Sequence, residues 1–182
     1  MPLRLVELAD VPYKLPRAIK DLIEHAEEHI SIFQESIGEQ ACPRFEPAEY
    51  LEVAEALLAV KHYLGPGPRF CEWGSGFGVV AAMASLLGFE AHGIERDGLL
   101  LDQAHKLNME CGIATQLHQA NLFSISEEQD RAFGPYTFDL IYAYPWPDEA
   151  PDWIHYFEQT AKSGAILLTF HDFGEIRIHQ KR

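Results

Sequence analysis

The chain has 182 residues and a formal net charge of −14, from 28 acidic and 14 basic side chains. Its apolar fraction of 47% predicts one globular domain rather than a disordered chain. The acidic excess and the lack of a basic stripe argue against unaided binding of DNA or RNA. No apolar run reaches the length that crosses a bilayer, and the N-terminus lacks a signal-peptide core, so we expect a cytoplasmic protein that binds no membrane.

The first part of the chain carries apolar residues at helical spacing. They recur over residues 16–37, where Pro16 fits a first helical turn and Gly38 a helix end, and again over residues 47–64 before the sequence GPGP. We therefore predict that residues 1–64 form a helical N-terminal extension, which also serves as a lid over the following domain.

The pattern changes after residue 68, where short apolar strands alternate with helices. We expect strands at 69–73, 90–95, 114–120, 137–144, 165–171 and 174–180, and helices at 77–88, 97–112 and 150–164. This alternation predicts an α/β fold with three layers, α/β/α, around a mostly parallel sheet of about six strands. Ligand-binding loops then gather at the carboxyl ends of the strands. The last strand leaves a sheet edge that is exposed, covered by the N-terminal helices, or paired with a second copy in a homodimer.

The stretch RFCEWGSGFGVV, residues 69–80, contains the most informative motif. A dinucleotide fingerprint that began at Gly74 and Gly76 would need glycine at Val79, but the third glycine is Gly78. Glu72 precedes these glycines, and its carboxylate would repel a pyrophosphate but accept a hydrogen bond from an ammonium group. A structural strand-to-helix turn is the alternative explanation.

Glu95 ends the next predicted strand, about twenty residues after the glycines. An acid at this place accepts hydrogen bonds from the two hydroxyls of a ribose. A ligand that combines a ribose with an ammonium group is S-adenosylmethionine rather than NAD. The alternative is that Glu95 is a solvated acid at a strand end.

Residues 69 to about 170 resemble the class I S-adenosylmethionine-dependent methyltransferases, with EWGSGFG as the glycine motif, Glu95 as the ribose acid, QANLF as the adenine segment and FDLIYAYPWPDE as the fourth-strand motif. The resemblance implies a Rossmann-like domain at residues 65–182, a single compact unit that binds S-adenosylmethionine as its cofactor. It implies no metal.

The same resemblance implies a role for each motif residue. Glu72 would orient the methionine amino group, directly or through water, and Glu95 would bind the ribose diol. The adenine would lie against Arg96, and its edge would be read by Asn121 and the backbone of Leu122. The remaining cofactor contacts would come from the backbone of Gly74, Ser75, Gly76 and Gly78. Asn121 could instead only form a turn.

The segment RFEPAEY, residues 44–50, resembles the segment that closes over the cofactor in several of these enzymes. Phe45 and Tyr50 are its candidate lid contacts.

The turn after the fourth predicted domain strand, YAYPWP, differs from the family pattern. Amine-directed relatives often carry Asp or Asn where this chain has Tyr144, so base-directed methylation of nucleic acid is not supported. Tyr144, Pro145 and Trp146 would bind the acceptor, with the two aromatic rings as walls for a flat or cationic group. The alternative is a rigid turn that caps the sheet.

Two residues are candidates for the catalytic step, Tyr144 and His171. His171 follows the next strand and titrates near neutrality, as a general base requires. Asp172, Asp148 and Glu149 are further candidates, and a capping or surface role is the alternative for His171.

The stretch HAEEH, residues 25–29, matches a zinc-peptidase pattern, H-x-x-E-H. His25 and His29 share one helix face at i and i+4, which could hold a metal. The pattern needs a distant third ligand and a large peptidase fold, and this segment has the composition of the acidic surface of an amphipathic helix, so we expect no metalloenzyme.

The sequence thus predicts a methyltransferase that acts on a small molecule or a protein side chain. A relative that binds the cofactor without catalysis remains open because of the unusual YAYPWP turn. Val79 and Glu72 disfavour a nicotinamide-dependent oxidoreductase.

Overall fold

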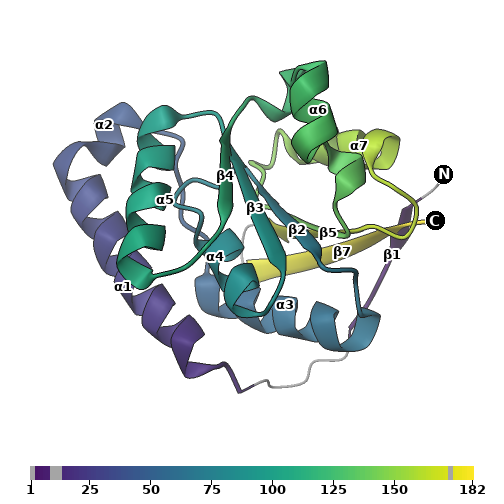
Figure 1. Cartoon of the computed structure of the whole chain (residues 1–182), viewed down its shortest axis with the longest axis horizontal. Helices are drawn as coiled ribbons and strands as arrows, with labels where there is room; N and C mark the ends of the chain where they lie inside the picture. The colour runs from purple at the N-terminus through teal and green to yellow at the C-terminus, as the bar shows by residue number, and fades with distance from the viewer. Residues whose placement is uncertain (1–2, 9–13, 172–173) are drawn as a thin grey trace.

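The structure is a computed structural model that describes residues 3–8, 14–171 and 174–182. Its centre is a seven-stranded sheet in the order β1-β7-β6-β5-β2-β3-β4 (Figure 1). The strands are β1 (Leu3–Leu5), β2 (Arg69–Trp73), β3 (Glu90–Glu95), β4 (Gln116–Gln119), β5 (Leu140–Ala143), β6 (Ile166–His171) and β7 (Glu175–Lys181). The five strands from β6 to β4 are parallel, whereas β7 and β1 are antiparallel additions at one side.

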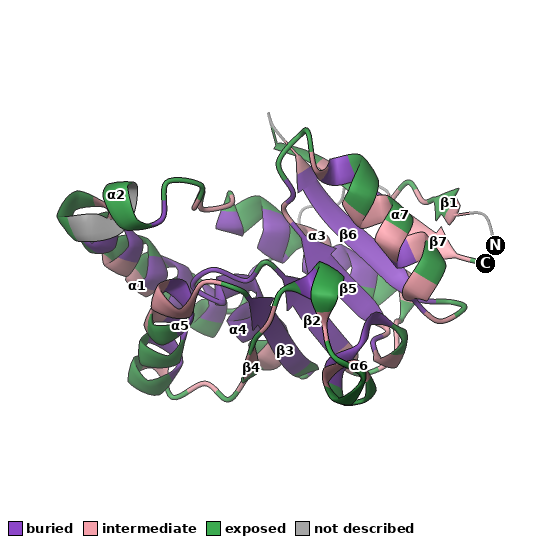
Figure 2. Ribbon diagram, turned by 90° about the horizontal axis from the view of Figure 1, so that it is seen from above, coloured by how far each residue is buried: buried purple, intermediate pink, exposed green. Residues whose placement is uncertain are grey.

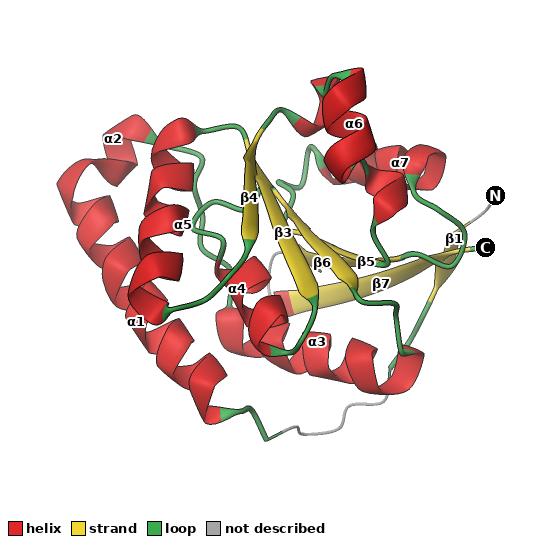
Figure 3. Ribbon diagram, viewed as in Figure 1, coloured by secondary structure: helices red, strands yellow, loops and turns green. Residues whose placement is uncertain are grey.

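Helices cover both faces of the sheet (Figure 3). They are α1 (Arg17–Phe33), α2 (Glu39–Ala41), α3 (Tyr50–Leu64), α4 (Val79–Leu86), α5 (Gly98–Cys111), α6 (Glu127–Phe133) and α7 (Ala150–Thr160), with a π-helical turn at Gln34–Gly38 and 3-10 turns at Leu122–Ser124 and Pro135–Thr137. The hydrophobic cluster on one face includes residues of α1, α3, α4 and α5, and the cluster on the other face includes residues of α6 and α7. The predicted three-layer α/β/α fold is therefore confirmed.

The central strands are apolar runs because both of their faces are buried. In β2, Phe70 belongs to one hydrophobic cluster and its neighbour Cys71 to the other, as the alternation of a strand requires. Figure 2 shows β2, β3, β5 and β6 as buried along most of their length. None of the described helices is long and apolar enough to cross a membrane.

The sheet has one strand more than predicted. Leu3–Leu5 pairs antiparallel with β7, with Leu3 opposite Lys181, although the sequence predicted only helices before residue 65. Three residues carry too short a pattern to distinguish a strand from a loop, and only the pairing partner at the other end of the chain makes them a strand. β1 thus covers the edge of β7 that the sequence left open. This pairing within one chain does not test the homodimer through the sheet edge, which stays a prediction.

The N-terminal helices share their core with the sheet. Ile19 and Phe33 of α1 and Leu57 of α3 are buried in the same hydrophobic cluster as Phe70 and Leu140. The division into an extension at residues 1–64 and a domain at residues 65–182 stays a prediction.

Capping residues set the ends of the helix α5. Asp97 Oδ1 accepts hydrogen bonds from the N–H groups of Leu99 at 2.9 Å and Leu100 at 3.4 Å. Gly112 ends the helix with φ +63°, a left-handed conformation that favours glycine. Both caps lie at the ends of the helix predicted over residues 97–112. Asp97 comes two positions after Glu95, the residue that ends β3.

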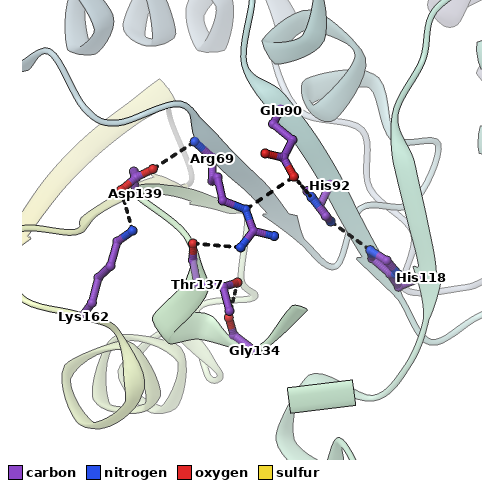
Figure 4. A network of polar contacts seen from close by, with 8 residues as sticks. All are labelled: Arg69, Glu90, His92, His118, Gly134, Thr137, Asp139 and Lys162. Atoms are coloured by element: carbon purple, nitrogen blue, oxygen red, sulfur yellow. Dashed lines mark hydrogen bonds and ion pairs between the residues drawn. The ribbon is translucent and has the colours of Figure 1, made fainter. Parts of the chain in front are cut away.

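A polar network connects the amino ends of neighbouring strands, at the edge of the sheet opposite to the loops at the carboxyl ends (Figure 4). Arg69 donates its backbone N–H to Asp139 at 2.9 Å and extends its guanidinium to Glu90 at 3.5 Å. His92 Nδ1 lies 3.0 Å from His118 Nε2, and burial lowers the pKa of both imidazoles. These groups join neighbouring strands far from the loops at the carboxyl ends.

Candidate functional site

A cavity of about 710 Å³ opens at the carboxyl ends of β2, β3, β4 and β5. Its walls are the glycine turn after β2, the ends of β3 and β4, the turn after β5, the segment at 41–50 and the start of α7. The predicted site residues among its lining are Glu72, Gly74, Ser75, Gly76, Glu95, Arg96, Asn121, Leu122, Tyr144, Pro145 and Trp146. Residues from four strand ends, spread over more than seventy positions of the chain, thus surround one space.

The glycine turn allows aromatic rings to approach its backbone closely. Gly74 and Gly76 have φ values of +65° and +51°. A Cβ on Gly74 would lie 3.1 Å from Trp153, and a Cβ on Gly76 would lie 2.7 Å from Phe45. Glycine is required at Gly76 for two reasons, its backbone conformation and the position of the Phe45 ring.

Gly78 has a different place from the other two glycines. It does not line the cavity but precedes α4 with φ +66°, and a Cβ there would lie 3.3 Å from the Cβ of Ala104. The close approach is to the helix α5, so the structure gives Gly78 a packing role.

Glu95 joins the glycine turn to the start of α5. Its buried carboxylate accepts the N–H of Gly76 through Oε2 at 2.8 Å and the N–H of Asp97 through Oε1 at 2.9 Å. A carboxylate has about four lone-pair sites, so each oxygen can accept one further bond from a ligand in the cavity. Two free acceptor sites match the two hydroxyl donors of a vicinal diol.

Glu72 lies buried at the base of the cavity. Its Oε2 accepts the N–H of Ala81 at 2.8 Å. Burial raises the pKa of Glu72 to about 8, and the charge of Glu95 contributes in the same direction. A cationic ligand group beside Glu72 would favour the ionised carboxylate and reverse this shift.

Two hydroxyl groups on the cavity wall have no hydrogen-bond partner among the described residues. They are the buried Oη of Tyr142 and the buried Oγ of Ser75. Burying a hydroxyl without a partner costs free energy, and a hydrogen bond from a polar ligand in the cavity would offset this cost. Their place beside Glu72 and Glu95 fits a ligand with several polar groups, which S-adenosylmethionine is.

The segment at 41–50 closes one side of the cavity. Phe45 stacks on Phe77 with ring centroids 5.2 Å apart, and both Phe45 and Tyr50 line the cavity. Arg44 binds Glu149 at 3.1 Å and lies 5.2 Å from the ring of Trp146. Phe45 and Tyr50, the candidate lid contacts, therefore both line this cavity, and their contact with a cofactor stays a prediction.

The turn after β5 forms the opposite wall. Tyr144 lies edge-on against Phe170 at 5.1 Å, and the indole of Trp146 donates to the carbonyl of Arg44 at 3.3 Å. Asn121 lines the cavity, and its Oδ1 accepts the N–H of Phe123 at 3.2 Å. Its side chain thus forms the turn that the sequence left as an alternative, at the edge of the cavity.

His171 lies outside this cavity. It lines a second hollow of about 660 Å³ together with His155 and Arg177, and its Nε2 lies 2.9 Å from Thr169 Oγ1. Pro145 and Pro147 line both hollows and so separate them. The structure does not bring His171 together with the predicted cofactor residues, and Asp172 lies outside the described residues.

Sequence reasoning missed several residues of the wall. Trp153 of α7 lies over Gly74, and Tyr142 and Asp97 also line the cavity. Tyr142 stands in an apolar strand and Trp153 in an amphipathic helix, where an aromatic residue is ordinarily part of the core. The sequence carries no signal that distinguishes them from core residues.

Comparison with known proteins gives relatives of one kind, although no family profile matches the chain. Over 115 residues the chain is 32% identical to the ribosomal protein L11 methyltransferase of Thermus thermophilus, a match that covers 63% of this chain and 42% of that protein. The chain thus spans less than half the length of this curated relative.

Several solved methyltransferases have the same fold. The O-methyltransferase of Bacillus cereus, solved with S-adenosylhomocysteine, has a TM-score of 0.60 at 12% identity over 88% of this chain and 68% of that one. The RNA methyltransferase of Salinibacter ruber, also solved with S-adenosylhomocysteine, has a TM-score of 0.59 at 18% identity, over 75% of this chain and 92% of that one. The chain is thus similar in sequence to one methyltransferase over 63% of its length, and it shares its fold with solved methyltransferases that were crystallised with S-adenosylhomocysteine.

Proposed function

We propose that the protein is a methyltransferase that binds S-adenosylmethionine in the cavity at the strand ends and transfers its methyl group to a small molecule or a protein side chain. The observation that carries this proposal is the convergence of the glycine turn, Glu95, Asn121 and the turn of Tyr144 on one cavity. In this proposal the nucleoside would lie beside Glu95 and Asn121, and the acceptor beside Tyr144.

The cofactor groups have matching partners along the cavity. Glu72 would accept a hydrogen bond from the amino group, Glu95 would bind the ribose diol, and Asn121 with Leu122 would hold the adenine edge. The unpartnered hydroxyls of Tyr142 and Ser75 would complete the polar contacts. S-adenosylmethionine supplies an electrophilic methyl group on a sulfonium.

Methyl transfer is an in-line displacement, so the chain contributes mainly by holding the two reactants in contact and in line. Tyr144, Pro145 and Trp146 would position the acceptor, and the segment at 41–50 would exclude water. Tyr144 is the predicted catalytic residue that lines the cavity. His171 would act only on an acceptor that reaches across the proline turn.

The surroundings of the acceptor end favour a cationic or flat group. Tyr144 and Trp153 offer aromatic rings and Asp152 offers a carboxylate, whereas Trp146 and Glu149 already contact Arg44. A cation is attracted both to aromatic faces and to carboxylates. The net charge of −14 disfavours a nucleic-acid backbone as the partner.

Calorimetric titration tests the cofactor. We expect S-adenosylhomocysteine to bind with one site per chain and NADH not to bind. Glu95→Gln should weaken binding, whereas Glu52→Gln, which changes an exposed acid on α3, should not. Binding of NADH without binding of S-adenosylhomocysteine would contradict the proposal.

Transfer of labelled methyl from the cofactor to fractionated cell extract tests the reaction. Label in a small-molecule or protein fraction supports the proposal, and label in RNA contradicts the proposed acceptor class. If the cofactor binds but no fraction is labelled, the protein is a cofactor-binding relative without catalysis.

A further inference from the structure

Two histidines and a glutamate meet on the side of the molecule where α1 and α5 lie next to each other (Figure 1). His25 and His29 are one turn apart on α1, and Glu110 stands near the end of α5. Glu110 Oε2 lies 3.1 Å from His25 Nε2 and 3.0 Å from His29 Nε2. One carboxylate oxygen of Glu110 on α5 therefore faces an imidazole nitrogen of each of the two histidines on α1.

The spacing of these donor atoms fits a small metal ion. One donor atom from each of the three residues lies within 4.8 Å of the others. In a tetrahedral site with metal–ligand bonds of about 2.0–2.1 Å, neighbouring ligand atoms are about 3.4 Å apart. The two measured nitrogen–oxygen separations are only a few tenths of an ångström shorter, so rotation of side chains alone would admit the ion.

The three side chains are reachable but held in place. Their exposed fractions are 36% for His25, 15% for His29 and 33% for Glu110. The second carboxylate oxygen, Oε1, faces the ammonium of Lys106 at 3.9 Å, which orients the carboxylate toward the histidines. To bind an ion, each imidazole would carry its proton on Nδ1, which leaves the lone pair of Nε2 directed toward Glu110 and the ion.

We propose that His25, His29 and Glu110 bind a divalent transition metal, Zn²⁺ in particular, as a structural cross-link between α1 and α5. Imidazole nitrogen and carboxylate oxygen are ligands that Zn²⁺ accepts, and water would fill the fourth position. The cross-link would attach the predicted N-terminal extension to the domain that carries Glu95.

The location favours a structural role over catalysis. Glu110 is separated from Asp97 by most of the helix α5, about 20 Å at a rise of 1.5 Å per residue. None of the three residues lines either of the two hollows described above. The metal would therefore act on stability, independently of the proposed methyl transfer.

Titration of the chelator-treated protein with ZnCl₂ tests the proposal by calorimetry. We expect one high-affinity site per chain and a rise of roughly 5 °C or more in the melting temperature at saturating Zn²⁺. Titration with CoCl₂ should give the intense visible absorption of a tetrahedral Co²⁺ site with nitrogen and oxygen ligands.

Three variants identify the ligands. His29→Ala and Glu110→Gln should each weaken Zn²⁺ binding roughly ten-fold or more and abolish the thermal shift. His105→Ala, an exposed histidine of the same helix α5, should leave both unchanged. Glu110→Gln preserves the shape of the side chain, and circular dichroism verifies that each variant folds.

Equal Zn²⁺ affinity in the wild-type protein and in Glu110→Gln would overturn the proposal, as would the absence of the Co²⁺ absorption in the wild-type protein. In that case the three residues form a hydrogen-bonded cluster only. Binding of S-adenosylhomocysteine is unaffected by either outcome, so this test is separate from that of the proposed function.

Discussion

The carboxylate of Glu95 accepts the backbone N–H of Gly76 at 2.8 Å, across nineteen positions of the chain. The acid that ends β3 thus fixes the glycine turn that follows β2. The same carboxylate accepts the N–H of Asp97, so it connects the turn, the strand and the start of α5. A residue predicted to bind a ribose also holds the backbone that would surround the rest of the ligand.

Glu95→Gln should weaken binding of S-adenosylhomocysteine by roughly one hundred-fold. The amide loses the negative charge that strengthens its hydrogen bonds, and its NH₂ group must face either Gly76 or Asp97, both of which are donors. Calorimetry measures the loss of affinity. Binding within about two-fold of the wild-type protein would contradict the role of Glu95, since each charge-assisted bond contributes about 1.5–3 kcal/mol.

Glu72→Gln should change how stability depends on pH. The folded protein keeps the Glu72 proton up to about pH 8, whereas the carboxyl of the unfolded chain ionises near its ordinary value of 4.5. Between these values the unfolded chain binds fewer protons, so the free energy of unfolding falls as pH rises. In Glu72→Gln this fall in the free energy of unfolding should be absent. Near pH 8 the variant should therefore melt at a higher temperature than the wild-type protein.

Thermal melts between about pH 5 and pH 8 measure this effect in the protein without ligand. Glu52→Gln is the control, because that side chain is exposed on α3. The same variant at Glu72 should bind S-adenosylhomocysteine more weakly, since a neutral amide attracts an ammonium less than a carboxylate does. Parallel pH profiles for Glu72→Gln and the wild-type protein would disprove the burial effect.

Gly76→Ala and Gly112→Ala separate backbone strain from close contact. Both glycines have positive φ, +51° and +63°, so each substitution should cost about 1 kcal/mol of stability. At Gly112 nothing lies within 4 Å of the added Cβ, whereas at Gly76 the Phe45 ring is 2.7 Å away. We expect only Gly76→Ala to displace the lid segment and weaken ligand binding.

Chemical denaturation and calorimetry on the two alanine variants give the comparison. Phe45→Leu combined with Gly76→Ala should recover part of the stability lost in Gly76→Ala alone, because the contact is relieved and the backbone strain remains. Equal losses of stability and binding at the two glycines would rule out the contact with Phe45.

Arg44→Ala should speed release of S-adenosylhomocysteine several-fold with little change in stability. Arg44 connects the segment at 41–50 to the opposite wall through Glu149 and the face of Trp146. The ion pair is largely exposed, so it contributes less than about 1 kcal/mol to folding. Stopped-flow fluorescence measures the rate, and Arg17→Ala, which removes the exposed pair with Asp21, is the control.

His118→Phe should make the protein less sensitive to acid. Burial lowers the pKa of His118 to about 4, with a contribution from His92, while the unfolded chain takes up the proton near 6.5. Stability is therefore lost as pH falls through this range. Phenylalanine keeps the stack on Phe133, whose ring centroid is 4.1 Å away, but carries no proton. Thermal melts of His118→Phe should show a smaller loss of stability on acidification than those of His105→Phe, which changes an exposed histidine.

Much of the fold followed from the sequence because local patterns determine it. The apolar runs of β2 and β5 and the helix between Asp97 and Gly112 were predicted correctly. The predicted helix end at Gly38 was wrong, because the chain continues there through a π-helical turn into α2. The spacing of Glu72, the three glycines and Glu95 indicated the cofactor class, since each lies at a strand end or in the turn after it. Parallel strands bring such ends to one edge of a sheet wherever the chain goes between them.

Only the tertiary structure decided which distant residues meet. β1 became a strand through pairing with β7, His171 was separated from the cavity by the proline turn, and Glu110 reached His25 and His29 from another helix. Local periodicity gives the direction of a side chain relative to its own helix or strand, but contacts across the chain depend on how the elements pack. The sequence by itself therefore determined the type of fold and the cofactor expected, and packing decided what surrounds them.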